Sequence, residues 1–490
     1  MMHGAAIAAM MLGTVLLLPA CNGGGSTPGG GPAGGGPPGG RSGAPGSPQP
    51  ATSASLTSAS RFGVFGAFTA FELRPFCQAA GFSEDDYMAW ASTHMKELGA
   101  HWTRSNLQFV WDEIEPTVGG ARDWNAMEAD DIIRAVYAPG NEVHFLAVFL
   151  TGRNLRNPLD RPDEYKAFVR AAVERYDGDG VDDLAAGVRV THWQVGNEVF
   201  EWERTGRGAQ EYAAWVRLVR EGALAADPDA RIVLMAPADD SAGRQVSAFL
   251  RDTIVELAPE RAFDVIDVHH WGRAGDWQMP AVAEYRRLLD SLGLEHVQIW
   301  SAENGTWQGQ PTQDPVLQTE DEQARSLVKR YVYNLNHGLD KLFWNNLVEW
   351  DRFMGHAGSI YNSMGLITDG RGPGEDPSRF NTERVAYWTY RTLAAHIDAG
   401  LARPLGALTG LPAHCHGYSY ERLADGRRFS VLWSEVGAQN VPLQVGGAGV
   451  RVTSLIPDRF GAVRFEADVT AVGGVAVVTV GDDPLLVMEQ

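Results

Sequence analysis

Val188-Arg-Val-Thr-His-Trp-Gln-Val-Gly-Asn-Glu198 is the stretch of this 490-residue chain that best indicates its fold. Apolar side chains fall on both faces of the run, which is typical of a strand buried in a parallel sheet. A second run, Val297-Gln-Ile-Trp-Ser-Ala-Glu303, has the same form. Because parallel strands end at one edge of their sheet, we expect Glu198 and Glu303 to face each other across a pocket.

Apolar runs of this kind occur eight times between residues 62 and 347, and amphipathic helical patterns lie between most of them. The helical patterns include Asp163–Tyr176, Glu320–Leu335 and Thr382–Ile397. Eight alternating units predict a (β/α)8 barrel over residues 61–398. A doubly wound open sheet is the structural alternative, but no Gly-rich phosphate motif follows the first strand to favour it. The eight runs are Phe62–Phe68, Ala100–Arg104, Val143–Phe149, Val188–Gly196, Arg231–Ala236, Phe263–His270, Val297–Ala302 and Lys341–Leu347.

After about residue 400 the pattern changes to short strands separated by turns, with a hairpin signal at Asp425-Gly426. This pattern predicts a small antiparallel β-sandwich domain over residues 399–490. We expect its role to be structural, and a sugar-binding surface is the alternative. The predicted strands are Gly417–Leu423, Arg428–Trp433, Val441–Val445, Val450–Leu455, Val463–Val469, Val475–Val480 and Leu485–Met488.

The N-terminal residues have the character of an export signal. The apolar run Ala5–Leu18 is too short to span a bilayer. Leu18-Pro19-Ala20-Cys21 resembles the lipobox of bacterial lipoproteins, which implies cleavage before Cys21 and acylation of that cysteine. No Lys or Arg precedes the apolar core, so a secretory signal cut elsewhere is the alternative. Residues 22–60 are rich in Gly, Pro and Ser and predict a disordered tether to the cell envelope, at the outer membrane or cell surface.

Composition limits the classes of molecule that this chain is expected to bind. The net charge of −20 argues against nucleic acid and against electrostatic docking on anionic membranes. Fifteen Trp is a high count, and some of these rings are candidates for stacking on sugar faces. If Cys21 carries lipid, Cys77 and Cys415 remain, either as a disulfide or as two thiols; sequence alone leaves this open. We expect a monomer.

The tripeptide that ends at Glu198 occurs twice in the chain, and the earlier copy shows that the tripeptide alone does not indicate a functional site. Gly140-Asn141-Glu142 repeats Gly196-Asn197-Glu198. The first copy precedes a predicted strand and is therefore expected on the opposite, stabilising face of the barrel. It is the position of Asn197 and Glu198 at the end of a predicted strand, and not the tripeptide itself, that indicates a functional site.

The residues at these strand ends resemble those of the retaining glycoside hydrolases of clan A. The order and spacing of the motifs along the chain resemble family 39, which contains xylosidases and iduronidases. The resemblance implies that Glu198, after Asn197 at the end of the fourth strand, is the acid/base. It implies that Glu303, at the end of the seventh strand, is the nucleophile, and that Arg104 lies beside it. The alternatives from the residues alone are a helix cap or surface charge for each glutamate and an ordinary salt bridge for Arg104.

Three further residues match sugar-binding positions of the clan: His269, Trp271 and Trp344. Trp344 corresponds to a tryptophan on the floor of the sugar site, although it and Trp271 could equally be core residues. Trp271 stands where the clan usually has a tyrosine that donates to the nucleophile. His269 and His270 point to opposite faces of a strand and cannot chelate a metal together, so we expect neither a metal nor a cofactor.

The predicted activity is hydrolysis of O-glycosyl bonds in a polysaccharide or oligosaccharide by double displacement, as in a xylosidase, glucosidase or endoglycanase. Burial near Glu303 is expected to raise the pKa of Glu198 so that it can donate a proton. Retention requires the two carboxyl groups to be about 5–5.5 Å apart. An inactive sugar-binding surface lipoprotein is the alternative.

Overall fold

The computed structural model describes residues 57–69, 73–105, 109–151, 156–199, 207–236, 243–349, 359–371 and 376–490. The predicted signal segment 1–21, with Cys21, lies outside the described residues, and so does most of the predicted linker 22–60. Among the described residues, no helix combines the length and the apolar character that a membrane span requires.

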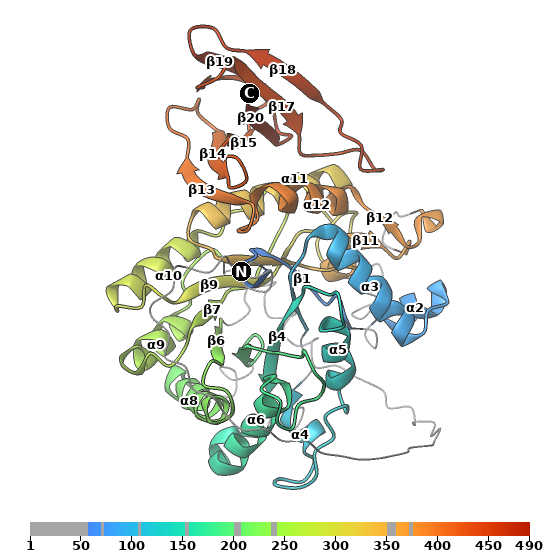
Figure 1. The fold of residues 1–490 in the computed structure, drawn as a ribbon, viewed down its shortest axis with the longest axis vertical. Helices are drawn as coiled ribbons and strands as arrows, with labels where there is room; N and C mark the ends of the chain where they lie inside the picture. The colour runs from blue at the N-terminus through green and yellow to red at the C-terminus, as the bar shows by residue number, and fades with distance from the viewer. Residues whose placement is uncertain are drawn as a thin grey trace, which may run out of the picture.

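Eight parallel strands form a closed barrel (Figure 1). β9 pairs with both β7 and β10, and β10 pairs in turn with β1, which closes the ring. Each predicted run contains one of these strands, so the predicted (β/α)8 barrel is confirmed and the open sheet is excluded. The barrel strands are β1 (Phe62–Phe65), β2 (Trp102–Arg104), β4 (His144–Leu150), β5 (His192–Val195), β6 (Arg231–Met235), β7 (Val265–Asp267), β9 (Gln298–Gly305) and β10 (Lys341–Trp344). Two short strands extend the ring, β3 (Phe109–Val110) beside β4 and β8 (His270–Trp271) beside β9.

Helices cover the outside of the barrel, and their apolar faces are turned toward it (Figure 1). α6, which covers the predicted helical pattern Asp163–Tyr176, buries one apolar face that includes Tyr165, Phe168 and Tyr176. α11 begins at a capping box in which Thr319 and Glu322 bond to each other's backbone N–H groups. The helices are α2 (Arg74–Ala80), α3 (Glu84–Leu98), α4 (Trp111–Ile114), α5 (Ala129–Val136), α6 (Pro162–Tyr176), α8 (Ala209–Ala226), α9 (Ala248–Leu257), α10 (Pro280–Ser291), α11 (Glu320–Asn336) and α12 (Val385–Ile397), with short 3-10 turns at Pro158–Asp160, Ala258–Glu260, Ile360–Ser363 and Pro377–Arg379.

One predicted helix boundary is wrong. Thr382–Glu383 forms strand β12, which pairs with β11 (Ile367–Thr368), and the last helix begins only at Val385. Backbone bonding to the loop after the eighth strand therefore overrides the helical pattern at its first residues.

The inside of the barrel is a packed core below the level of the glutamates. Seven apolar side chains fill it, among them Trp102, Trp300 and Phe343. At the bottom, the Nζ atom of Lys341 lies 4.7 Å from the ring centre of Trp102 and donates to the carbonyl oxygen of Ser60 at 2.6 Å. The bottom is thus closed, and chemistry is left to the carboxyl ends of the strands.

A second domain of antiparallel strands follows α12 and lies against α11 and α12 (Figure 1). Its six-stranded sheet and a separate β16–β19 pair enclose an apolar cluster that includes Leu432, Val441 and Val478. The predicted β-sandwich is confirmed, and all seven predicted strands are present. The strands are β13 (Ala402–Ala407), which was not predicted, β14 (Cys415–Arg422), β15 (Arg428–Ser434), β16 (Gln439–Gln444), β17 (Gly449–Ser454), β18 (Glu466–Thr470), β19 (Val475–Val480) and β20 (Leu485–Glu489).

The structure answers the open question about the two cysteines of the folded part. Cys77 lies buried in α2 and Cys415 lies in β14, and both are free thiols. They do not form a disulfide.

Candidate active site

Glu198 reaches the site through a turn directly after β5. Gly196 has φ 77°, and a Cβ atom there would lie 2.8 Å from Cγ1 of Val199, so the turn requires glycine. Glu198 itself has φ 46°, a left-handed conformation that is rare for a residue with a side chain. Such backbone strain concentrates at functional sites, where the surrounding structure holds it.

Glu303 reaches the site through an irregularity in β9. Leu342 of β10 pairs with Ser301, whereas Trp344, two residues later, pairs with Asn304, three residues later. The extra residue acts as a β-bulge and reverses the alternation of side chains. Ala302 belongs to the barrel interior, and without the bulge Glu303 would point out toward the helices.

The bulge is fixed from outside by Arg330 of α11. This buried guanidinium donates to Oδ1 of Asn304 at 3.0 Å and to the carbonyl oxygen of His270 at 3.3 Å. It therefore ties the ends of β8 and β9 to the same helix. Both strands carry residues of the candidate site.

Arg104, at the end of β2, lies beside Glu303 as the resemblance implied. Its guanidinium is fully buried and forms an ion pair with Oε1 of Glu303. It also donates to Oε1 of Gln194 at 3.1 Å and to Oδ1 of Asn197. Arg104 thus holds the nucleophile candidate and orients the Asn197 amide, leaving the amide nitrogen of Asn197 as a donor.

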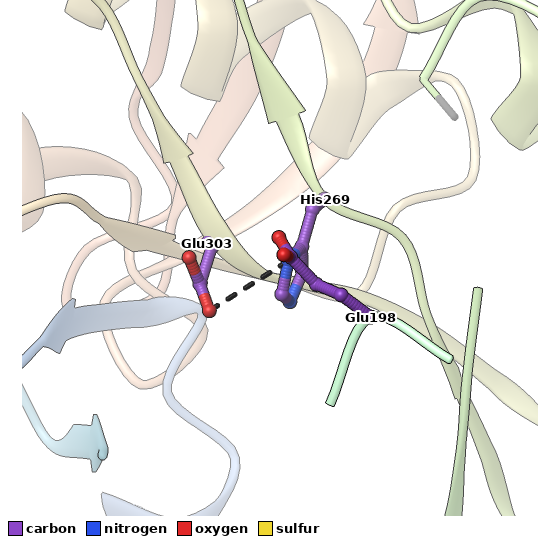
Figure 2. A group of neighbouring side chains, drawn as sticks. All are labelled: Glu198, His269 and Glu303. Atoms are coloured by element: carbon purple, nitrogen blue, oxygen red, sulfur yellow. Dashed lines mark hydrogen bonds and ion pairs between the residues drawn. The ribbon is translucent and has the colours of Figure 1, made fainter. Parts of the chain in front are cut away.

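His269 joins the two glutamates (Figure 2). Its Nδ1 atom lies 3.1 Å from Oε1 of Glu198 and 3.7 Å from Oε1 of Glu303. Its Nε2 atom lies 3.2 Å from Oδ2 of Asp267, a fully buried carboxylate of β7. The ring is thus held between three carboxyl groups from three strands.

The two catalytic candidates are close enough for a double displacement. One carboxylate oxygen of Glu198, one of Glu303 and a ring nitrogen of His269 all lie within 4.8 Å of one another. The carboxyl separation in retaining glycosidases is about 5–5.5 Å, and in inverting enzymes it is about 6.5–9.5 Å because a water must fit between the groups. The geometry matches the retaining class.

The electrostatics distinguish Glu198 from its neighbours. Burial and the nearby charge of Glu303 raise the pKa of Glu198, although His269 and Arg104 act in the opposite direction. Burial opposes a charge on His269, but Glu303, Asp267 and Glu198 outweigh it and raise the pKa of His269 from 6.5 to about 9. At neutral pH the site therefore holds two cations, Arg104 and His269, among its carboxyl groups.

Trp271 lies on β8, with its ring centre 5.2 Å from that of His269 and 5.4 Å from that of Tyr361. Its indole Nε1 has no hydrogen-bond partner among the described residues. Trp271 therefore does not donate to Glu303 as a tyrosine at this position would. It forms an aromatic wall beside the site with Tyr361.

The prediction for Trp344 is corrected by the structure. Its side chain is fully buried in the layer between barrel and helices, and its Nε1 donates to the carbonyl oxygen of Met364 at 3.0 Å. Alternation along β10 puts Phe343 inside the barrel and Trp344 outside. The next residue, Asn345, comes to the site instead, with Nδ2 3.5 Å from Oε2 of Glu303.

Sequence reasoning missed Gln194, Asp267 and Asn345. Gln194 precedes Asn197 on the inward face of β5, so strand alternation alone could have found it. Asp267 stands two residues before His269 on the same face, a signal of the same kind. The placement of Asn345 depends on the orientation of β10, which the three consecutive apolar residues Leu342-Phe-Trp344 do not reveal.

The repeated tripeptide lies where expected, away from the site. Asn141 precedes β4, and its Nδ2 donates to Ser92 and to the carbonyl oxygen of Ala135 at the amino-terminal face of the barrel. Glu142 is exposed. This copy of the tripeptide has a structural role.

Within the part of the chain that the structure describes, two groups of side chains have the spacing of metal ligands. One is Glu198, His269 and Glu303, already occupied by the contacts above. The other is Asp177, Asp179 and Asp183, in the loop after α6, whose oxygens accept backbone N–H groups of that same loop. His270 points away from the site, with Nε2 2.8 Å from the carbonyl oxygen of Asp276.

Comparison with solved structures agrees with this architecture. A family 39 glycoside hydrolase from Bacteroides cellulosilyticus WH2 matches with a TM-score of 0.62 and 14% identity, over 89% of this chain and 82% of that one. A glucosidase from Croceicoccus marinus matches with a TM-score of 0.54 and 12% identity, over 82% and 92%. An alpha-L-arabinofuranosidase from Thermotoga maritima matches with a TM-score of 0.54 and 13% identity, over 83% and 90%.

The chain therefore has the barrel-plus-β-domain fold that these glycoside hydrolases share. No family model matches the sequence, and no curated protein matches it.

Proposed function

We propose that this chain is a retaining glycoside hydrolase that cleaves O-glycosyl bonds of a polysaccharide or oligosaccharide, as a xylosidase, glucosidase or endoglycanase does. The observation that carries the proposal is the pair of buried carboxyl groups at the carboxyl ends of β5 and β9, with one oxygen of each within 4.8 Å of the other. The raised pKa of one member supports unequal roles for the two.

The first step is attack by Glu303 on the anomeric carbon. The carboxylate forms a new C–O bond while the bond to the leaving group breaks, and Glu198 protonates the departing oxygen. Arg104 and Asn345 hold Glu303 in place for this attack. Asn197 donates its amide nitrogen to a sugar hydroxyl.

The second step frees the sugar. Glu198, now a carboxylate, takes a proton from water, whose oxygen bonds to the anomeric carbon, and the ester bond to Glu303 breaks. The two inversions restore the original configuration. No metal or cofactor takes part in this scheme.

The chain offers a matched control for testing these roles. Glu198→Gln should lower turnover of an unactivated substrate roughly 10²–10⁴-fold, the usual contribution of a general acid/base. Glu303→Gln should remove turnover, and azide should rescue Glu303→Ala with inverted product. Glu142→Gln changes the same tripeptide at the opposite face and should keep full activity.

The measurement is a screen of aryl glycosides and polysaccharides with the wild-type protein and these variants. Activity that survives both glutamine substitutions would contradict the proposal. Sugar binding by the wild type without any hydrolysis would instead favour an inactive sugar-binding surface protein.

We further propose that Cys21 anchors the enzyme to the bacterial cell envelope through lipid. The support is the lipobox-like Leu18-Pro19-Ala20-Cys21 and the Gly/Pro-rich segment that follows it. Expression of the full chain in a bacterial host with labelled palmitate should label the wild type. Label retained in Cys21→Ser would contradict the anchor.

A further inference from the structure

Asp267 is a buried carboxylate that the proposed chemistry does not use. It has no exposed surface and therefore cannot touch a sugar. Its Oδ1 accepts the backbone N–H of Ala302 at 2.7 Å, and its Oδ2 faces Nε2 of His269 at 3.2 Å. Asp267 therefore connects the strand of the nucleophile candidate, β9, to the imidazole that touches both catalytic candidates.

Three acidic groups face His269, and they come from β7, from β9 and from the turn after β5. Asp267 faces Nε2, and Glu198 and Glu303 face Nδ1 at 3.1 and 3.7 Å. Arg104 lies beyond Glu303 as its ion-pair partner. Acceptors on both sides of the ring favour a proton on each nitrogen, so the geometry favours an imidazolium.

We propose that Asp267 is a positioning residue that keeps His269 doubly protonated. The Nδ1–H of His269 can then donate a hydrogen bond to whichever of Glu303 and Glu198 is charged at each step of the reaction. This inference rests on the proposed function. The pKa of His269, raised to about 9 by its three acidic neighbours, agrees with it.

The charge in the site moves but does not change in total. Before reaction, Glu303 is the carboxylate and Glu198 carries a proton. When Glu303 forms its ester and Glu198 gives its proton to the leaving oxygen, the negative charge passes to Glu198. The Nδ1–H of His269, within 3.7 Å of both oxygens, can follow that charge without a movement of the backbone. A fixed positive charge on His269, between Glu303 and Glu198, stabilises the negative charge on either carboxylate.

A neutral His269 would work against the acid. With a proton only on Nε2, its Nδ1 atom would accept a hydrogen bond from protonated Glu198. That bond would hold the proton which the leaving oxygen needs. The negative charge of Asp267 prevents this arrangement by favouring a proton on both nitrogens.

Asp267→Asn is a nearly isosteric test. The single oxygen of asparagine can still accept the N–H of Ala302, which preserves the strand contact. Its NH2 group would then face Nε2 of His269, where it can only donate, so His269 should become neutral with its proton on Nδ1. Asp340→Asn is the matched control, because Oδ2 of Asp340 accepts the N–H of Ile299 at 2.8 Å on the same strand, near the barrel floor.

The first measurement is independent of catalysis. Two-dimensional NMR with ¹⁵N-labelled histidine, assigned with His269→Ala, should show both ring nitrogens of His269 protonated at pH 7 in the wild type and in Asp340→Asn. Asp267→Asn should show protonation on Nδ1 alone at that pH. A doubly protonated His269 in Asp267→Asn, or a neutral His269 in the wild type, would overturn the proposal.

The second measurement is kinetic. Loss of the positive charge on His269 should raise the pKa of Glu198 further. For each unit by which this pKa rises, the ionised fraction of Glu198 falls about tenfold at a pH below the pKa. Glu198 is needed as a carboxylate in the second step, so both kcat and KM for an activated aryl glycoside should fall together in Asp267→Asn as the glycosyl-enzyme accumulates. Unchanged kcat and KM would contradict the proposal. Absence of turnover in the wild type would instead refute the proposed function, while the NMR result would still report on Asp267 and His269.

Discussion

Glu198 combines two features that cost free energy in a folded protein, a left-handed backbone and a buried carboxyl group. Its φ of 46° carries a strain of about 1–3 kcal/mol, and its side chain is only 2% exposed. The carboxyl group is held by the ring of His269, with Nδ1 3.1 Å from Oε1 of Glu198. Both are explained if the residue must present a protonated carboxyl group toward a bound sugar.

The raised pKa of Glu198 predicts the pH dependence of catalysis. In its proposed role as the acid, Glu198 works only while protonated, so kcat/KM should fall as pH rises through the pKa of Glu198, which lies above the ordinary 4.5. Glu198→Gln, assayed with an activated aryl glycoside that needs no acid, should lose this limb. Glu142→Gln should keep it. The measurement is kcat/KM across the pH range. A limb near pH 4.5, or one unchanged in Glu198→Gln, would refute the assignment.

At the scale of elements, the ends of β9 and β10 decide which residues reach the site. The bulge in β9 turns Glu303 inward, and the alternation of β10 turns Trp344 outward and brings in Asn345. Two adjacent residues of one strand therefore have different roles, although both lie in an apolar-looking run.

That difference is measurable. Asn345→Ala removes a hydrogen bond to a charged group and should lower kcat about 10- to 100-fold with little change in stability. Trp344→Phe removes one of two donors to the carbonyl oxygen of Met364, where Nε2 of Gln323 remains at 3.2 Å, and should cost about 0.5–1.5 kcal/mol of unfolding free energy while the kinetic constants stay near wild type. Steady-state kinetics and denaturant unfolding on both variants test this. The reverse pattern would support Trp344 as part of the sugar site.

The same geometry explains which residues of the site could be predicted from the sequence and which could not. The barrel strands and the positions of Glu198, Glu303 and Arg104 could be predicted, because apolar runs mark buried strands and their ends mark one face of the barrel. The orientation of Asn345 could not be predicted, since the apolar run Leu342-Phe-Trp344 does not show which of its residues face the barrel interior. The bulge that turns Glu303 inward also leaves no trace in composition. Likewise, the pattern assigned Thr382 to a helix that begins at Val385, because the bonding of β12 to β11 is a tertiary contact.

At the scale of the whole molecule, the β-sandwich is joined to the barrel by one continuous core. Trp433 of β15 packs against Trp277 beside the barrel, with ring centres 5.7 Å apart. On α11, Asn336 donates to the hydroxyl of Tyr420 at 2.7 Å, and Lys329 forms an ion pair with Asp482. Because these contacts bury aromatic surface between the two domains, we expect the domains to be stable only together.

The shared core predicts cooperative unfolding. Residues 57–490 should unfold in one calorimetric transition, and a chain ending at residue 398 should be less stable or insoluble because it exposes Trp277 and the faces of α11 and α12. As a control, Arg464→Ala removes only a surface ion pair with Asp321 and should cost no more than about 1 kcal/mol. Two separate transitions in the longer chain would show that the domains are independent.

The central claim is that Glu198 and Glu303 cleave a glycosidic bond by double displacement, and its most direct test is the configuration of the product. Proton NMR of the first sugar released from any substrate that the enzyme hydrolyses shows the anomer before mutarotation. The product is expected to have the same anomeric configuration as the substrate, because one carboxylate oxygen of Glu198 lies within 4.8 Å of one of Glu303. Release of the opposite anomer would contradict it.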